Sequence, residues 1–240
     1  MRMTRKVTLC VMARFSDIFE LCRESLDHFA PDLPKILVRD THEITPPPGW
    51  TVIQGPLEFS YSGNRNLAWR AADSESDLFD IGDDVRLIDF STIEQMQAIA
   101  YSDPRIGILS PKIIGGAGNP IQNNPPISPI SYTRMRIPLI ATYIKREVID
   151  GIGYMDEQFS GYGFDDTDYC RRTHLAGYRL GVTPCVSVRH GALGYSLMST
   201  SLKKYGGDLS ALEAQLAENQ ALYFKKWGDV TREWSEVQIM

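Results

Sequence analysis

The sequence predicts an α/β protein whose mostly parallel sheet is flanked by helices. Short apolar runs alternate with amphipathic segments along the chain, and clusters of Pro and Gly separate them. A strand, a helix and a second strand open the chain, which is the unit from which parallel sheets are built. With 240 residues, 43% of them hydrophobic, the chain can bury one large core, so we expect a single domain over residues 1–240.

The first half of the chain supplies most of the expected sheet. The segment 16–29, SDIFELCRESLDHF, carries apolar residues near helical spacing, and the runs on either side of it are short and apolar. The break PPPGW precedes the next strand, and SGNRNLAWRAA has the composition of a helix. We expect strands at 6–13, 35–40, 50–54 and 77–82, and helices at 16–29 and 62–72.

The second half continues the alternation but contains a long irregular piece. A helix at 91–102 and a strand at 106–110 precede the Pro- and Gly-rich segment 115–138, which we expect to be a functional surface loop. Further along, we expect a strand running into a short helix at 139–153, a helix that starts at Asp165 and stops at Gly177, a pair of strands at 178–182 and 185–190, and a C-terminal helix at about 207–228 with its leucines in the core.

Composition excludes several classes of protein. A net charge of −5 disfavours wholesale binding to a phosphate backbone, and no segment approaches the ~20 apolar residues of a membrane span. The four cysteines are far apart and fit reduced thiols in a cytosolic protein. The basic start before the apolar run 7–13 resembles a signal peptide, but the run is short, so a buried strand is favoured. We expect a cytoplasmic protein, either free or peripheral to a membrane.

Carboxylates gather at two places where parallel sheets bind ligands. Asp83 and Asp84 follow the strand at 77–82, and a metal ion is one reason to place like charges side by side there. Asp165, Asp166 and Asp168 lie in the first turn of a helix, where the helix dipole also favours acids, so a purely structural role stays open. His190 ends a further expected strand.

Taken together, the motifs resemble the family-two glycosyltransferases of the GT-A fold. The segments SGNRNLAWRAA, DLFDIGDDV, FSGYGFDDTDYCRR, VSVRHGALGYS and ENQALYFKKWG occur in the order and at about the spacing found in that family. The resemblance implies a Rossmann-like sheet with a nucleotide-binding half at about 1–110, an acceptor-binding half at about 111–200 and a C-terminal helical extension.

The resemblance also assigns roles to residues of this sequence. The Asp-x-Asp motif of the family falls on Gly82, Asp83 and Asp84, so Asp84 takes the metal-ligating position while the first carboxylate is missing. Asp83 would take over its contact with the donor. The metal-binding His of the family falls on His190, and the pair that supplies the catalytic base falls on Asp165 and Asp166. Contacts with the nucleotide are expected from Arg14, Asp40 and Arg65.

These residue types suit a metal-dependent, inverting sugar transfer from a nucleotide sugar. Mg²⁺ or Mn²⁺ would neutralise the leaving diphosphate, and Asp166, with Asp165 in reserve, would take the proton of the acceptor hydroxyl. Two alternatives stay open. Gly82 suggests a pseudoenzyme that only binds the sugar nucleotide, and a sugar-phosphate nucleotidyltransferase has a related topology, although ARFSDIF offers no Gly-rich phosphate loop.

The sequence leaves the acceptor open. A glycan or lipid-linked glycan is favoured, with protein and modified nucleic acid as alternatives, and both a monomer and a homo-oligomer remain open. Acceptor choice is expected in the segment 115–138 and in the segment after His190. Tyr162, between two glycines, is the aromatic residue most suited to stack on a sugar.

Overall fold

One sheet organises the part of the chain that the computed structural model describes, which is residues 5–115, 118–134, 136–191 and 202–228. Its strand order is β3-β2-β1-β4-β8-β6-β9-β5, with β7 paired to β9. The first four strands in this order are parallel, as the sequence predicts. Their bounds are β1 (Val7–Ala13), β2 (Lys35–Arg39), β3 (Thr51–Gln54) and β4 (Asp77–Gly82).

The second half of the sheet is mixed rather than parallel. It consists of β5 (Val85–Arg86), β6 (Ile106–Ile114), β7 (Ser131–Thr133), β8 (Ala141–Ile144) and β9 (Arg179–His190). β8 runs antiparallel to both β4 and β6, whereas β6 and β9 are parallel. Because β8 reverses direction between its two neighbours, β6 and β9 again run the same way as β4, and the ends of all three strands point to one edge.

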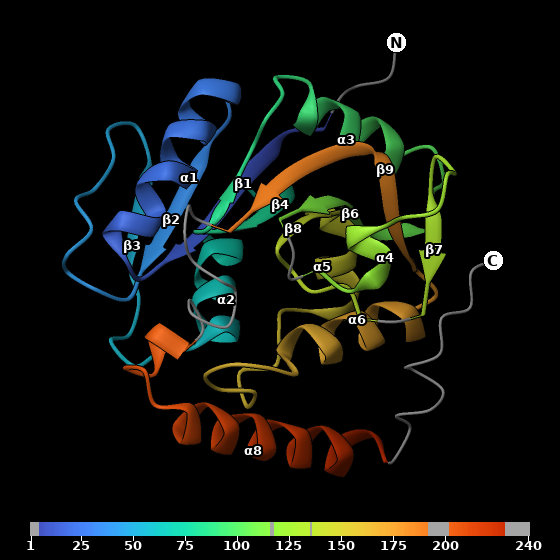
Figure 1. Ribbon diagram of the computed structural model, residues 1–240. Helices are drawn as coiled ribbons and strands as arrows, with labels where there is room; N and C mark the ends of the chain where they lie inside the picture. The colour runs from blue at the N-terminus through green and yellow to red at the C-terminus, as the bar shows by residue number, and fades with distance from the viewer. Residues whose placement is uncertain (1–4, 116–117, 135, 192–201, 229–240) are drawn as a thin grey trace.

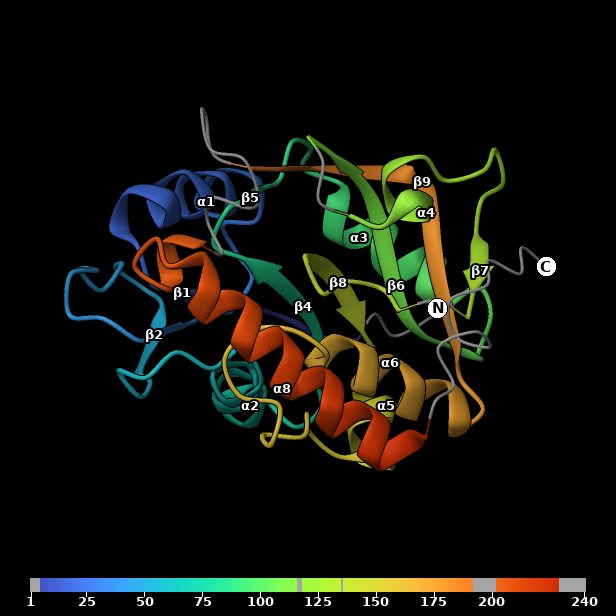
Figure 2. The ribbon, with the colours of Figure 1, turned by 60° about the horizontal axis from the view of Figure 1, so that its bottom comes forward.

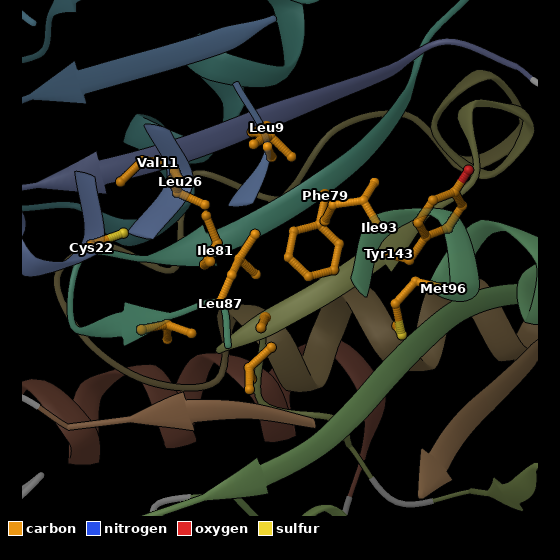
Figure 3. Close-up of a cluster of buried hydrophobic side chains, with 14 of the residues drawn as sticks. Leu9, Val11, Cys22, Leu26, Phe79, Ile81, Leu87, Ile93, Met96 and Tyr143 are labelled. Atoms are coloured by element: carbon orange, nitrogen blue, oxygen red, sulfur yellow. The ribbon is translucent and has the colours of Figure 1, made fainter. Parts of the chain in front are cut away.

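Helices cover both faces of the sheet (Figure 1). Buried residues of β1 alternate between two hydrophobic clusters, as a strand's two-residue period requires. Leu9 and Val11 face α1 (Ser16–Phe29) and α3 (Thr92–Ala100), as the close-up of this cluster in Figure 3 shows. The other face packs against α2 (Tyr61–Ala71), α5 (Arg146–Ile152) and α6 (Asp165–Leu175).

Two expected elements differ in the structure. The predicted pair of strands at 178–182 and 185–190 is one strand, β9, and Pro184 interrupts its pairing with β6 without ending it. The segment 115–138 is not wholly irregular, since it contains α4 (Pro120–Asn123) and β7. Residues 116, 117 and 135 of that segment lie outside the described residues.

The C-terminal helix α8 (Leu209–Trp227) lies outside the layer of α2 and α6, and Figure 2 shows it running across both. Asp208 caps its start by accepting hydrogen bonds from the backbone N–H of Ser210 and Ala211. Near its end, Trp227 Nε1 donates to Asp168 Oδ1 of α6 at 2.8 Å. None of the helices in the described residues is long and apolar enough to cross a membrane.

Candidate active site

The carboxyl ends of four strands bring most of the predicted site residues to one edge of the sheet. Arg14 follows β1, Asp40 follows β2, Asp83 and Asp84 follow β4, and His190 is the last residue of β9. Ligands of open α/β sheets bind at this edge. Residues that are up to 176 positions apart in sequence, counted from Arg14 to His190, therefore belong to one region.

Asp84 and His190 are in direct contact. His190 Nε2 lies 3.1 Å from Asp84 Oδ1, and the backbone N–H of Gly191 donates to the Asp84 carbonyl at 2.9 Å. The pairing of β5 with β9, in which Val85 stands opposite His190, sets this geometry. Gly115 is required beside it, because a Cβ there would lie 2.3 Å from the His190 carbonyl oxygen and its φ is +106°.

The two neighbouring carboxylates have different protonation behaviour. Burial, together with the charge of Asp84, raises the pKa of Asp83 to about 6. Burial alone would also raise the pKa of Asp84, but the hydrogen bond and charge of His190 outweigh it and hold that pKa below its ordinary value. Asp84 therefore stays ionised to a lower pH than Asp83 does. An ionised carboxylate is the form that binds a cation.

These residues border a cavity of about 570 Å³ between the sheet edge, α6 and α8. Its walls come from residues 82–84 at the end of β4, from the start of α6 and from one side of α8. The sequence predicts that side of α8 as core packing. The lining residues on the polar side are Tyr61, Arg65, Asp83, Asp84, Arg136, Asp165, Asp166, His190 and Glu213; Leu209, Leu212, Leu216, Leu139, Ile140 and Phe164 give the apolar side, and Tyr162 also lines it.

The three aspartates of α6 are separated by their surroundings. Asp165 is buried, its Oδ2 accepts from Arg65 Nη1 at 3.3 Å, and burial with the adjacent Asp166 charge raises its pKa to about 6. Asp166 lines the cavity and has a looser ion pair with Arg136, at 3.8 Å between Nη1 and Oδ1. Asp168 is fully buried, faces α8 and is not among the lining residues.

Arg65 holds the middle of the site together. Its Nε donates to Asp80 Oδ1 at 3.0 Å, and its Nη2 donates to the Leu139 carbonyl at 2.7 Å, in addition to the bond with Asp165. These bonds join α2, β4 and α6. Each nitrogen of the guanidinium thus donates a hydrogen bond to a protein oxygen. The predicted contact with a nucleotide would involve the part of Arg65 that lines the cavity.

The other two predicted nucleotide contacts lie together at the ends of β1 and β2. Arg14 Nη1 lies 3.1 Å from Asp40 Oδ2, and the Arg14 backbone N–H donates to Asp83 Oδ2 at 3.4 Å. Asp40 is 3% exposed, and burial raises its pKa although the Arg14 charge opposes this. Asp40 Oδ1 and the neighbouring Asn64 Oδ1 are buried without a hydrogen-bond partner in the described residues.

Several residues at the site are not indicated by the sequence. Arg136 and Pro138 come from the segment 115–138. The sequence predicts a role at the site for this segment but not for any single residue in it. Glu213 and three of the lining leucines come from α8, and Lys204 precedes that helix. An isolated charge on an amphipathic helix does not indicate a site in the sequence. The segment predicted to follow His190 at the site, residues 192–201, lies outside the described residues.

The residues present fit a divalent cation only in partnership with a ligand. In the described part of the chain, no group of three or more His, Cys, Asp or Glu side chains could hold a metal ion. Asp84 and His190 offer two donors, with the buried Asp83 carboxylate next to them. Mg²⁺ and Mn²⁺ are commonly held by one or two carboxylates together with phosphate oxygens and water, and this donor set is compatible with that arrangement.

Comparison with solved structures places this architecture among the glycosyltransferases of the GT-A fold. No protein-family profile and no curated protein matches the sequence. The structure is similar to residues 1–349 of S. aureus TarS, a GT-A glycosyltransferase of family two, with a TM-score of 0.59 and 13% identity over 94% of this chain and 74% of that one. It is also similar to GalNAc-T7, solved with UDP, GalNAc and Mn²⁺, with a TM-score of 0.63 and 13% identity over 85% of this chain and 47% of that one. The chain has the GT-A fold, as the motifs predict.

Proposed function

We propose that this protein is a metal-dependent, inverting glycosyltransferase that moves a sugar from a nucleotide sugar to an acceptor hydroxyl. The observation that carries the proposal is the composition of one cavity, which contains the Asp84–His190 pair on the sheet side and the Asp166 carboxylate on the α6 side. A leaving diphosphate and an attacking hydroxyl need these two kinds of group at opposite ends of the reacting bond.

Two buried acceptors after β2 and in α2, neither of which lines the cavity, support a nucleoside as the donor's other half. The unpartnered oxygens of Asp40 and Asn64 are acceptors for N–H or O–H groups, and burial makes an unsatisfied acceptor costly. The GT-A relative solved with UDP, GalNAc and Mn²⁺ adds support for a sugar nucleotide and a divalent cation. When bound, the cation supplies positive charge that stabilises the departing diphosphate.

The residues of the chain then have separable roles in the transfer. Asp84 and His190 would hold the cation, and Asp83 would contact the donor. Asp166 accepts the proton of the acceptor hydroxyl as its oxygen attacks the anomeric carbon, and the bond to the diphosphate breaks on the opposite side. A single base with direct displacement gives inversion. Asp165, held by Arg65, keeps the start of α6 in place. We favour a glycan or lipid-linked glycan as acceptor.

A thermal-shift screen tests the proposal. Because a ligand that binds only the native state raises its melting temperature, a nucleotide sugar with Mn²⁺ should raise it more than either component alone. The same sugar nucleotide should then be hydrolysed slowly to nucleoside diphosphate in a metal-dependent reaction. Binding without any release would favour the pseudoenzyme suggested by Gly82, and no shift with any sugar nucleotide would refute the proposed function.

A further inference from the structure

Lys204 contacts Tyr61, a residue that lines the cavity, although Lys204 comes from the C-terminal part of the chain. It belongs to a short helical segment, 202–204, that precedes α8. Its Nζ donates to Tyr61 Oη at 2.6 Å and lies 4.3 Å from the centre of the Tyr61 ring and 5.0 Å from that of Phe59. Tyr61 begins α2 and lines the cavity. The two aromatic rings therefore hold the ammonium next to a residue of the cavity wall.

The charge of Lys204 is coupled to the carboxylates of this end. Burial would lower the pKa of an ammonium, but Tyr61, Asp83 and Asp84 outweigh burial and raise the pKa of Lys204. Conversely, Lys204 acts to lower the pKa of Asp40 and of Asp83. Lys204 is thus a protonated group in the field of the acids that follow β2 and β4.

The ammonium of Lys204 has hydrogen-bond donors to spare. A lysine ammonium has three N–H donors, and across the described residues one hydrogen bond, to Tyr61, uses one of them. All three guanidinium nitrogens of Arg65 donate to protein oxygens, whereas Arg14 uses Nη1 for both the Asp40 pair and the Leu57 carbonyl. A ligand with several anionic oxygens would find its open donors at Lys204.

We propose that Lys204 is a binding residue for the diphosphate group of the donor nucleotide. The proposal rests on the proposed function and adds to it a cationic side chain that the sequence motifs do not indicate. Three carboxylates at this end repel an anionic ligand, and a fixed ammonium beside them offsets that repulsion and forms charge-assisted hydrogen bonds with phosphate oxygens. Because Lys204 lies a few residues before the start of α8 at Leu209, donor binding would also fasten the C-terminal segment that forms the far wall of the cavity.

Isothermal titration of Lys204→Met tests this proposal. The titrants are UDP, GDP, ADP, CDP and TDP, each with Mn²⁺, and then the nucleoside of the best binder. Lys204→Met should weaken diphosphate binding about tenfold or more, with nucleoside binding changed less than twofold, since each charged hydrogen bond is worth roughly a factor of ten or more. Lys204→Arg should retain most of the affinity. If Lys204→Met does not fold, Lys204→Gln replaces it.

Lys203→Met is the matched control, because Lys203 pairs with Asp17 on the surface, at 3.3 Å. It should bind the diphosphate as the parent does. Equal diphosphate affinity in the parent and in folded Lys204→Met or Lys204→Gln would overturn the proposal and leave the proposed function standing. A parent that binds none of the five diphosphates would overturn both.

Discussion

Asp166 and Asp168 lie two residues apart in the first turn of α6 but face different surroundings. Asp166 lines the cavity, whereas Asp168 accepts from Arg172 Nε at 2.9 Å and from Trp227 Nε1 at 2.8 Å. If Asp166 is the base, Asp166→Asn should reduce turnover roughly 10²- to 10⁴-fold with donor affinity and melting temperature nearly unchanged. Asp168→Asn should lower the melting temperature and leave the chemical step nearly intact.

The measurements for this pair are turnover with one accepted substrate, donor dissociation constant and melting temperature. Asp165→Asn is the third variant, since Asp165 stands in reserve as base. Full turnover in Asp166→Asn would remove that residue from the chemistry, and an equal loss in Asp165→Asn alone would move the base back by one residue.

The raised pKa of Asp165 makes a prediction about stability. Because the pKa is about 6 in the folded protein and near 4 in an unfolded chain, the folded state holds this proton more tightly. The corresponding stability is fully present below pH ~4 and is lost as pH rises through about 6. The free energy of unfolding of the parent, minus that of Asp165→Asn, should therefore fall by about 2 kcal/mol between pH 4 and pH 7. Urea titrations across this range measure it, and a difference that is constant or rises with pH would contradict the assignment.

At the scale of elements, α8 fastens the loop that precedes α6. Asn219 is 2% exposed, and its Nδ2 lies within hydrogen-bond distance of the carbonyls of Ser160, Tyr162 and Gly163, at 2.8, 3.2 and 2.9 Å. This loop contains residues with positive φ, including Phe164 at +66° just before the first turn of α6. Its conformation thus depends on a partner from a distant part of the chain.

Removing this contact should loosen the loop. Asn219→Ala should lower the free energy of unfolding by about 1–3 kcal/mol, because buried carbonyls lose their donors. Amide hydrogen exchange should quicken at residues 160–164. The control is Gln220→Ala, which changes an exposed neighbour on the same helix. Equal exchange and equal stability in the two variants would show that α8 does not hold the loop.

The elements themselves were largely predictable, and the reasons for the exceptions are local. The apolar run at 77–82 predicts β4 with its observed bounds, since a buried strand has a strong compositional signal. By contrast, β5 has two residues, and β9 continues through Pro184 because its pairing with β7 and β6 holds the strand on either side. A two-residue strand and a strand that continues through a proline both lack the alternation of apolar and polar residues by which a sequence predicts a strand.

The candidate site was predictable where its residues follow strands. Asp84 and His190 stand at the ends of apolar runs, and the structure brings them into contact. Lys204 and Arg136 reach the site through the path of the chain in three dimensions, which no local pattern records. Likewise, the leucines of α8 have the spacing of core residues, and only the structure shows that some of them line the cavity.

At the scale of the whole molecule, we propose that the sheet edge, α6 and α8 enclose a metal-dependent site for a sugar nucleotide. The topology keeps the Asp84–His190 pair apart from Asp166, because β4 and β9 bring Asp84 to His190 while α6 and α8 form the opposite wall. A substitution at Asp84, the proposed cation ligand, should therefore leave Asp166 undisturbed.

The most direct test is the affinity for a nucleoside diphosphate, measured by calorimetry with Mn²⁺ and with EDTA, for the parent and for Asp84→Ala. The parent should bind at least tenfold more tightly with Mn²⁺, and Asp84→Ala should lose that gain while its affinity in EDTA stays close to that of the parent. Asp32→Ala, an exposed change at the opposite edge of the sheet, is the control and should behave as the parent. A gain from Mn²⁺ that survives in Asp84→Ala would contradict the account.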